Sequence, residues 1–474
     1  MPSILPAGYR SRSSKRERVG VVILQEGTTA RLAAHIAGAE GRPLSPEVIE
    51  NVKHHLLDTI AAIVSGSRMD AGEAGLSYVK GQGGKKEALV IGRRYRTSAV
   101  NAALANGMAA HADETDDSHA ASLTHPGCAV VPAALAMAER GGASGAELIR
   151  AVAVGYDLVA LSGAALGAIK FAQAGKCCHG FAGAIGAGAA AAAAAGLNAE
   201  QSAYVLSYAA QQASGVMTWL RDDSHVEKAF DFAGMPARNG VAAATMVQSG
   251  MTGTPDVFDG TPNFTAAFAI DPEARMQVQN LGEKYAVVET NIKRWSVGSP
   301  AQAVLDALEI MIGRDGLTAE AVASMRIRLP AHGARVVNNR DMPDINVQHL
   351  AALIVVDGTM SFAASHDVER MKDPAVLDMR KRIELVPDDV LSRAYPSRQS
   401  IVEISLKDGR ELRHHTKAVR GTFENPMTWD EVVAKSMDLI APILGKARAK
   451  KLVAATEGLH AARKLDRFID LLHS

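Results

Sequence analysis

Apolar residues recur at helical spacing through most of the first 278 residues. Ser45 and Pro46 are typical of an N-cap and a first helical position. The apolar residues that follow them fall on one helical face: Val48, Val52, Leu56, Ile60 and Ile63. Farther along, Ser144 and Glu147 have the spacing of a capping box ahead of another helix. These patterns predict a large helical domain that begins near residue 28.

Residues 182–196, AGAIGAGAAAAAAAG, contain no bulky side chain except Ile185. A segment that is apolar on every side is typical of a helix buried among other helices, and small side chains let those neighbours approach closely. We therefore expect a central buried helix here. The run GAIGAG resembles a dinucleotide-binding loop, but no strand pattern precedes it, so we do not expect a Rossmann site.

The hydrophobic period changes to two beyond residue 280. Residues 325–329 alternate between apolar side chains and arginine, which predicts a strand with one solvated face. Residues 401–406 alternate in the same way, and Asp408-Gly409 is a typical hairpin turn. Helical patterns at 300–312 and 347–356 lie between these strands. This part of the chain therefore predicts an α+β module.

Thr428 and Glu431 form another capping-box pattern, at which the chain returns to helix. The sequence thus predicts a mainly α fold with two domains. A large all-helical domain would consist of residues 28–278 and 428–474, and a smaller α+β lid domain, 279–427, would be inserted before the C-terminal helices. We interpret residues 1–27, with five basic side chains, as a basic N-terminal tail; a transit peptide is the less favoured alternative.

The charge balance and the cysteines narrow the class of protein. With 51 basic and 51 acidic side chains, the formal net charge is zero, so no global field favours nucleic acid or an anionic membrane. No uninterrupted apolar stretch predicts a membrane span. Three cysteines in 474 residues favour a reducing compartment, and we expect a cytoplasmic protein. Cys128, Cys177 and Cys178 match no zinc or iron–sulfur spacing. This argues against an enzyme that uses an iron–sulfur cluster to dehydrate hydroxy acids.

The run HADETDDSHAASLTHPG, residues 111–127, gathers four acids and three histidines in a mostly apolar region. The acids could hold Mg²⁺ against a diphosphate, and the histidines could bind zinc or iron. A capped helix end with solvated acids is the simpler alternative. The histidines favour a third interpretation, proton transfer, because imidazole titrates near neutral pH.

Three further segments carry candidate residues. His179 precedes the small-residue run, so we expect its ring near a helix N-terminus, where the pKa of imidazole is lowered and anions bind; taken alone, a single histidine is more often structural. Lys228 could bind a substrate carboxylate or transfer a proton, and Arg221 lies close in sequence. Lys293 and Ser299 flank a strand-to-helix junction, where anions bind readily.

These residues carry a family resemblance. The run NGMAAHADETDDSHAASLTHPGCAVVPAALAMAE, residues 106–139, resembles the signature of the MmgE/PrpD family. That family includes 2-methylcitrate dehydratases, cis-aconitate decarboxylases and iminodisuccinate epimerases. The likeness continues through His179-Gly-Phe, Lys228 and Lys293-x-Trp295, and it covers roughly residues 30 to 465.

The resemblance implies a helical domain and a smaller lid with the active site between them, usually in a homodimer. It also implies small di- or tricarboxylate substrates, without a metal or an organic cofactor. The positions it marks as catalytic are Asp116, Asp117, His125, His179 and Lys228. We expect the substrate-binding positions to be Glu114, Ser118, Arg221, Lys293 and Ser299.

The chain departs from the family pattern in several places. Glu114 replaces the first aspartate, Ser118 replaces a threonine, and Gln302 replaces a histidine common four residues before Asp306-Ala307. Residues 336–341 lack the tyrosine and the Asn-Arg-Pro run that decarboxylating relatives tend to have. These losses argue against cis-aconitate decarboxylation.

We therefore predict a cofactor-independent hydro-lyase that abstracts a proton next to a carboxylate, similar to 2-methylcitrate dehydratase. His125 and His179 would divide the acid and base roles, and Asp117 would orient a histidine. An epimerase, a decarboxylase and a non-catalytic carboxylate-binding paralogue remain alternatives. The expected partners are a small carboxylate and a second copy of the chain, with no nucleic acid and no membrane.

Overall fold

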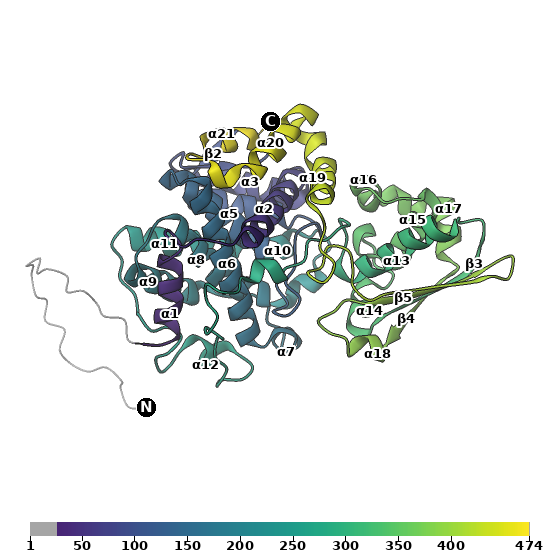
Figure 1. The fold of residues 1–474 in the computed structure, drawn as a ribbon, viewed down its shortest axis with the longest axis horizontal. Coiled ribbons are helices and arrows are strands. Elements are labelled where there is room, and N and C mark those ends of the chain that lie inside the picture. The colour runs from purple at the N-terminus through teal and green to yellow at the C-terminus, as the bar shows by residue number, and fades with distance from the viewer. Residues whose placement is uncertain (1–25, 474) are drawn as a thin grey trace, which may run out of the picture.

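The computed structural model describes residues 26–473 (Figure 1). The basic tail expected at residues 1–27 therefore lies almost entirely outside the described residues. Figure 1 shows a larger helical body and, at its side, a smaller body that carries the main sheet. The predicted mainly α class, with a smaller α+β part, is confirmed.

The larger body is built mostly from helices. They are α1 (Thr28–Ala37), α2 (Pro46–Gly66), α3 (Asp70–Gln82), α4 (Ala99–Ala110), α5 (Pro126–Gly141), α6 (Gly145–Leu166), α7 (Ala168–Gln173), α8 (Cys178–Ala194), α9 (Ala199–Gln212), α10 (Val226–Ala229), α11 (Met235–Gln248), α12 (Phe264–Phe268), α19 (Trp429–Leu444), α20 (Lys446–Glu457) and α21 (Asp466–Ile469). The expected caps form, since Ser45 accepts from the N–H of Val48 and Ser144 and Glu147 make a capping box. A short hairpin, β1 (Ala88–Val90) with β2 (Tyr95–Thr97), corrects the all-helical prediction for this body.

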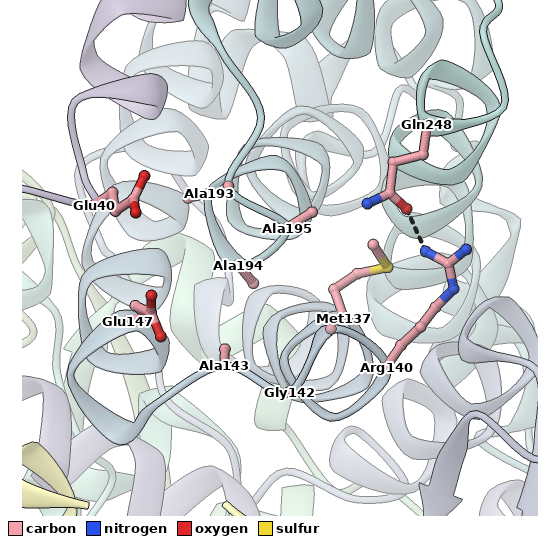
Figure 2. A pocket seen from close by; sticks show the side chains of 12 residues that line it. Glu40, Met137, Arg140, Gly142, Ala143, Glu147, Ala193, Ala194, Ala195 and Gln248 are labelled. Atoms are coloured by element: carbon pink, nitrogen blue, oxygen red, sulfur yellow. Dashed lines mark hydrogen bonds between the residues drawn. The ribbon is translucent and has the colours of Figure 1, made fainter. Parts of the chain in front are cut away.

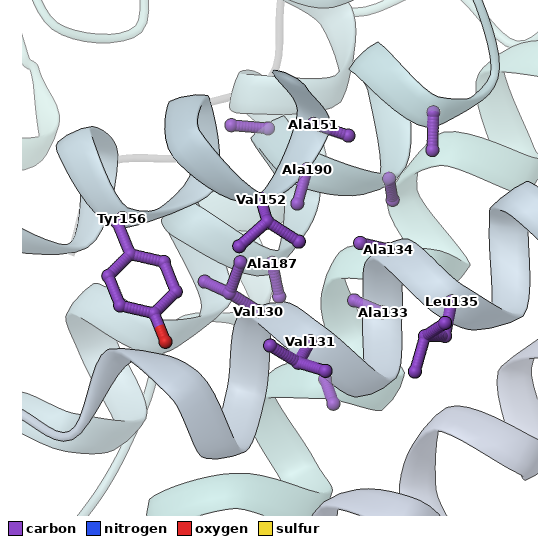
Figure 3. Packing of buried hydrophobic residues seen from close by; sticks show 14 of the residues in the cluster. Val130, Val131, Ala133, Ala134, Leu135, Ala151, Val152, Tyr156, Ala187 and Ala190 are labelled. Carbon is purple, nitrogen blue, oxygen red and sulfur yellow. The ribbon is translucent and has the colours of Figure 1, made fainter. Parts of the chain in front are cut away.

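Helix α8 is the central buried helix that the small-residue run predicts. It packs against α5, α6 and α11, and the cluster drawn in Figure 3 includes residues of α5, α6 and α8. The packing leaves no room for a side chain at Gly186, where a Cβ would come within 2.2 Å of Val159 Cγ2. At Gly240 of α11 a Cβ would lie 2.4 Å from the backbone nitrogen of Gly188.

The smaller body combines helices with a four-stranded sheet. Its elements are α13 (Ser299–Asp315), β3 (Val322–Pro330), α14 (Ala331–Val337), α15 (Val347–Asp357), α16 (Phe362–His366), α17 (Pro374–Arg380), β4 (Ile383–Asp388), α18 (Asp389–Ser392), β5 (Ser400–Leu406) and β6 (Glu411–Thr416). The strand order is β4-β3-β5-β6, with β3 parallel to β4 and antiparallel to β5. Met325 pairs with Ile404 and Ile327 with Val402, so the apolar faces of both predicted strands coincide. Strand β4 is an addition to the prediction.

Two hydrophobic cores correspond to the two bodies. One contains buried residues from Leu32 to Ile292 and again from Met427 to Leu472, and α19 packs on α2. The other contains buried residues from Trp295 to Leu406. Among the described residues, only α6 is long and apolar enough to cross a membrane, and 83% of its apolar window is buried within the protein, as in a core helix.

Candidate active site

The segment that joins α4 to α5 holds the titratable cluster. His111 lies at the C-cap of α4, and His125 is the N-cap residue of α5. The acids between them are all buried, none more than 6% exposed: Asp113, Glu114, Asp116 and Asp117. The alternative of solvated acids at a helix end is therefore wrong.

Asp116 is the acceptor at the centre of the cluster. Both of its oxygens lie 3.0 Å from Nδ1 of His111, and Oδ2 lies 3.1 Å from Nδ1 of His125. The ammonium of Lys293 lies 3.5 Å from Oδ1. Burial alone raises the pKa of Asp116, but the attraction of His111, His125 and Lys293 outweighs it and holds the pKa well below its usual value. Asp116 is thus an ionised carboxylate that orients two imidazoles.

His125 and His179 form a stacked pair. Their ring centroids are 5.0 Å apart, and the ring of Phe232 lies 3.7 Å from that of His179. Burial lowers the pKa of His125 to about 4, against the opposing charge of Asp116. Burial also lowers the pKa of His179, well below its usual value, and neither of its ring nitrogens has a hydrogen-bond partner. Both imidazoles are therefore neutral at pH 7 and able to accept a proton.

Two lysines approach the cluster, and both face carboxylates of the chain itself. Lys228 forms an ion pair with Glu114, and its ammonium lies 5.3 Å from the ring centre of Phe232. A π-helical turn, η2 (Phe230–Gly234), follows α10 and places that ring against His179. Lys293 donates to the carbonyl of Glu114 at 2.8 Å. Burial lowers the pKa of Lys293, but Asp116 and Glu114 outweigh it and raise that pKa above its usual value.

Asp117 lies in the same segment but holds a different histidine from the expected pair. Its Oδ2 lies 2.7 Å from Nδ1 of His55 on α2 and accepts from the hydroxyl of Tyr156 at 2.5 Å. Its Oδ1 accepts from the backbone N–H of Gly127 at 2.9 Å. Asp117 therefore fixes the first turn of α5, next to His125, through the backbone.

The remaining predicted residues divide into two groups. Ser118, Lys293 and Ser299 line one small cavity, and the buried hydroxyl of Ser299 has no hydrogen-bond partner. Gln302 lines the same cavity, and its side chain hydrogen-bonds the backbone of residues 295–297. At the position where the family commonly has a histidine, this chain therefore has a residue with a structural contact. Arg221 is exposed at the end of η1 (Met217–Arg221), and no contact joins it to the cluster within the described residues. Its expected substrate-binding role therefore has no geometric support.

Four residues of the site were missed from the sequence. His111 opens the run at residues 111–127 and His225 lies between Arg221 and Lys228 in the sequence, and their rings lie 5.3 Å apart. Their closeness in sequence to predicted site residues was the available signal. His55 comes from α2, and Arg398 comes from the loop before β5, where it lines the same cavity as Ser299. No local pattern distinguishes either of these two.

Comparison with known proteins identifies the family. Residues 30–277 match the MmgE/PrpD N-terminal domain, and residues 295–460 match the MmgE/PrpD C-terminal domain. The chain belongs to the MmgE/PrpD family. This MmgE/PrpD protein is similar to the "Cis-aconitate decarboxylase-like protein oryM" of Aspergillus oryzae, with 21% identity over 473 residues, which cover 94% of this chain and 97% of the relative. It is also 21% identical over 476 residues to the "Cis-aconitate decarboxylase" of Aspergillus terreus, covering 95% of this chain and 96% of that one. These relatives support an enzymatic role for the MmgE/PrpD protein.

Two buried sets of side chains in this MmgE/PrpD protein have ligand atoms within 4.8 Å of one another, as a metal site requires: His111, Glu114 and His225, and His111, Asp116 and Cys128. Lys228 and Lys293 compete with a metal ion for both carboxylates. Burial raises the pKa of Cys128 well above its usual value, which keeps the thiol protonated. The cluster is thus better suited to proton transfer than to metal binding.

A larger surface pocket of the MmgE/PrpD protein, about 200 Å³, lies elsewhere (Figure 2). It is formed at the C-terminal ends of α5 and α8, where Arg140 bonds Gln248. His179 is at the opposite end of α8, and a 17-residue helix is about 25 Å long. The carboxylate of Glu147 is engaged in the capping box with Ser144. The titratable residues that line this pocket are Glu40, Arg140 and Glu147, and no histidine or lysine lines it.

Proposed function

We propose that this protein is a lyase that acts on a small di- or tricarboxylate by proton transfer at a carbon next to a carboxylate. The observation that carries the proposal is the stacked pair of neutral imidazoles, His125 and His179, inside a buried cluster that also contains ammonium groups. Neither an organic cofactor nor a metal ion is required for this chemistry.

His125 is the better-positioned base. Asp116 accepts the hydrogen of Nδ1, so the free electron pair of the neutral ring is on Nε2. The proton next to a carboxylate is weakly acidic, and its removal leaves enolate charge that must be stabilised. Lys228 is close enough to His179 for its charge to lower the pKa of that ring, so the ammonium is also placed to stabilise charge developing beside the pair.

His179 supplies the second proton-transfer group. In a dehydration, the base removes the C–H proton, a C=C bond forms, the C–O bond breaks and the hydroxyl leaves as water after receiving a proton. A substrate carboxylate next to His179 would raise its pKa, because an opposite charge favours the protonated form. Substrate binding would thereby convert a neutral ring into an acid.

Decarboxylation is the second candidate, favoured by the names of the two relatives. In that reaction the C–CO₂ bond breaks, and the carbanion takes a proton from one of the same imidazoles. Gln302 and residues 336–341 depart from the pattern of decarboxylating relatives, so the hydro-lyase remains our first choice.

The test is to incubate the purified protein with 2-methylcitrate, citrate, cis-aconitate and iminodisuccinate, with and without EDTA. Growth of ultraviolet absorbance signals a new C=C bond, and release of CO₂ signals decarboxylation. Deuterium uptake from D₂O without either change would instead indicate epimerisation. Loss of turnover in EDTA, or binding of these acids with no reaction of any kind, would contradict the proposal.

A further inference from the structure

The cations nearest the two histidines are already neutralised by the chain. Lys228 faces Glu114, and Lys293 faces Glu114 and Asp116. Two ammonium groups and two carboxylates leave no net positive charge for an anionic substrate. A third cation is therefore needed if the site is to bind a molecule with two or more carboxylates.

Arg398 is a further cation close to the cluster. It is partly buried, and within residues 26–473 its guanidinium makes no hydrogen bond and no ion pair. Burial lowers the pKa of Arg398, against the opposing charges of Tyr395 and Glu114, and a guanidinium still remains charged at neutral pH. Arg398 also acts electrostatically on Lys293, which places it close to the cluster.

The loop that carries Arg398 is fixed on both sides. The hydroxyl of Tyr395 donates to the carbonyl of Ala120, in the segment of the histidine cluster, at 2.5 Å. At the other end of the loop, the hydroxyl of Ser400 donates to the carbonyl of Ala303 on α13, at 2.9 Å. The loop thus bridges the two bodies and holds Arg398 at their junction.

Ser299 completes a set of donors suited to a carboxylate. It lines the cavity with Arg398, is only 8% exposed, and its hydroxyl has no partner. It begins the 17-residue helix α13, whose N-cap residue, Gly298, has no side chain to cap the helix. A buried hydroxyl, a helix N-terminus and an unpaired guanidinium together favour a bound anion, and guanidinium matches the two oxygens of a carboxylate.

We infer that Arg398 and Ser299 bind a carboxylate of the substrate that does not react. The histidines belong to the larger body and Arg398 to the smaller one, so the two ends of a dicarboxylate would be held by different bodies. The subsite would make the protein selective for dianions over monoanions. This inference rests on the proposed function, because it assigns the far end of the same substrate.

The probes are succinate, tricarballylate and succinamate, in which an amide replaces one carboxylate. Isothermal titration calorimetry should show that the wild type binds succinate at least about tenfold more tightly than succinamate, because a charge-assisted hydrogen bond is lost with the second carboxylate. Arg398→Met should abolish that preference and weaken succinate binding about tenfold or more. Arg398→Lys should restore only part of it, because lysine cannot bind both oxygens in the same geometry.

Arg393→Met is the matched control, since Arg393 is exposed on the same loop. Ser299→Ala gives a second test, with an expected loss of about threefold to tenfold in affinity. Wild-type affinity for succinate in folded Arg398→Met, or no binding of succinate and tricarballylate to the wild type, would overturn the inference. Turnover with an unchanged KM in Arg398→Met would reject the subsite and leave the proposed function intact. Binding that depends on Arg398, without turnover of any candidate substrate, would support the subsite and reject the proposed function.

Discussion

The ring of His125 stacks on the ring of His179 at a centroid distance of 5.0 Å, although the two residues begin different helices. His125 is the N-cap residue of α5, and His179 lies in the first turn of α8. Two helix N-termini therefore meet at one pair of imidazoles. Their partial positive charge acts in the same direction as burial, because both disfavour the imidazolium form. The arrangement keeps two bases neutral beside a carboxylate and two ammonium groups.

Replacing either histidine of this pair should abolish most of the activity and leave binding in place. His125→Asn and His179→Asn should each lower kcat by at least about a hundredfold, because each removes a proton-transfer group. Calorimetry with succinate should show affinity within a few-fold of the wild type. His460→Asn is the control, since His460 is exposed. Full activity in both site variants would remove the basis of the proposed mechanism.

The pH dependence should report the lowered pKa of His125. A free imidazole loses its proton near pH 6.5, whereas the pKa of His125 is lowered to about 4. Because the neutral ring is the base, the rate of C–H proton abstraction, measured as deuterium exchange from D₂O into limiting substrate, should stay nearly constant from pH 7 down to about 5 and fall as the pH approaches 4. Buried neutral histidines also cost stability in acid, so circular dichroism must confirm the fold at each pH. A midpoint near 6.5 in the folded protein would contradict the assignment of the base.

Asp116 and Asp117 are neighbours in sequence and should behave differently. Asp116→Asn removes the acceptor that fixes His125, and a loss of tenfold to a hundredfold in kcat is expected, as for carboxylates that orient a functional histidine. Asp117→Asn disturbs the contacts to His55 and Tyr156, so it should lower the free energy of unfolding by about 1–3 kcal/mol. Its kcat should fall less than tenfold. Equal losses of kcat in two equally stable variants would show that this division of roles is wrong.

Much of the helical body was predictable because caps and small-residue runs are local signals. The run at 111–127 also located most of the site, since its titratable side chains stand together in the sequence. The partner of Asp117 was not predictable, because His55 reaches it only through the packing of α2 against α5. Arg398 was also not predictable. Its guanidinium is notable because it has no partner among the described residues, and only the folded chain shows this.

His366 should make stability fall in mildly alkaline solution. Its Nε2 lies 3.0 Å from Oδ2 of Asp113, which joins α16 of the smaller body to the histidine cluster as an ion pair. Burial lowers the pKa of His366, but Asp113 and Asp344 outweigh it and raise the pKa to about 9. A histidine whose pKa is raised in the folded protein stabilises the fold. This stabilisation is fully present below the pKa of the unfolded chain, near 6.5, and is lost as the pH rises through 9. The expected loss is about 1–3 kcal/mol.

Thermal unfolding of wild type and His366→Asn at pH 6 and pH 9.5 measures this effect. The variant should be less stable at pH 6, and the difference should shrink at pH 9.5. His415→Asn is the control, because His415 lies on β6 and its ring bonds Gln399 instead of Asp113. A difference that is independent of pH would show that the ion pair does not control stability in this range.

The close contact between α8 and α11 should tolerate no added methyl group. In Gly240→Ala, the new Cβ would lie 2.4 Å from the nitrogen of Gly188, and backbone cannot move aside as a flexible side chain can. We expect a loss of about 1–3 kcal/mol in the free energy of unfolding, the usual cost of overpacking, measured by urea denaturation. Gly313→Ala is the matched control, because Gly313 is also helical but a Cβ there would meet nothing within 4 Å. That change should stabilise the protein by about 0.5–1 kcal/mol. Helix α8 carries His179, and α11 follows the turn with Phe232. Gly240→Ala should therefore also lower kcat, whereas Gly313→Ala should not. Unchanged stability in Gly240→Ala would mean that the two helices can separate freely.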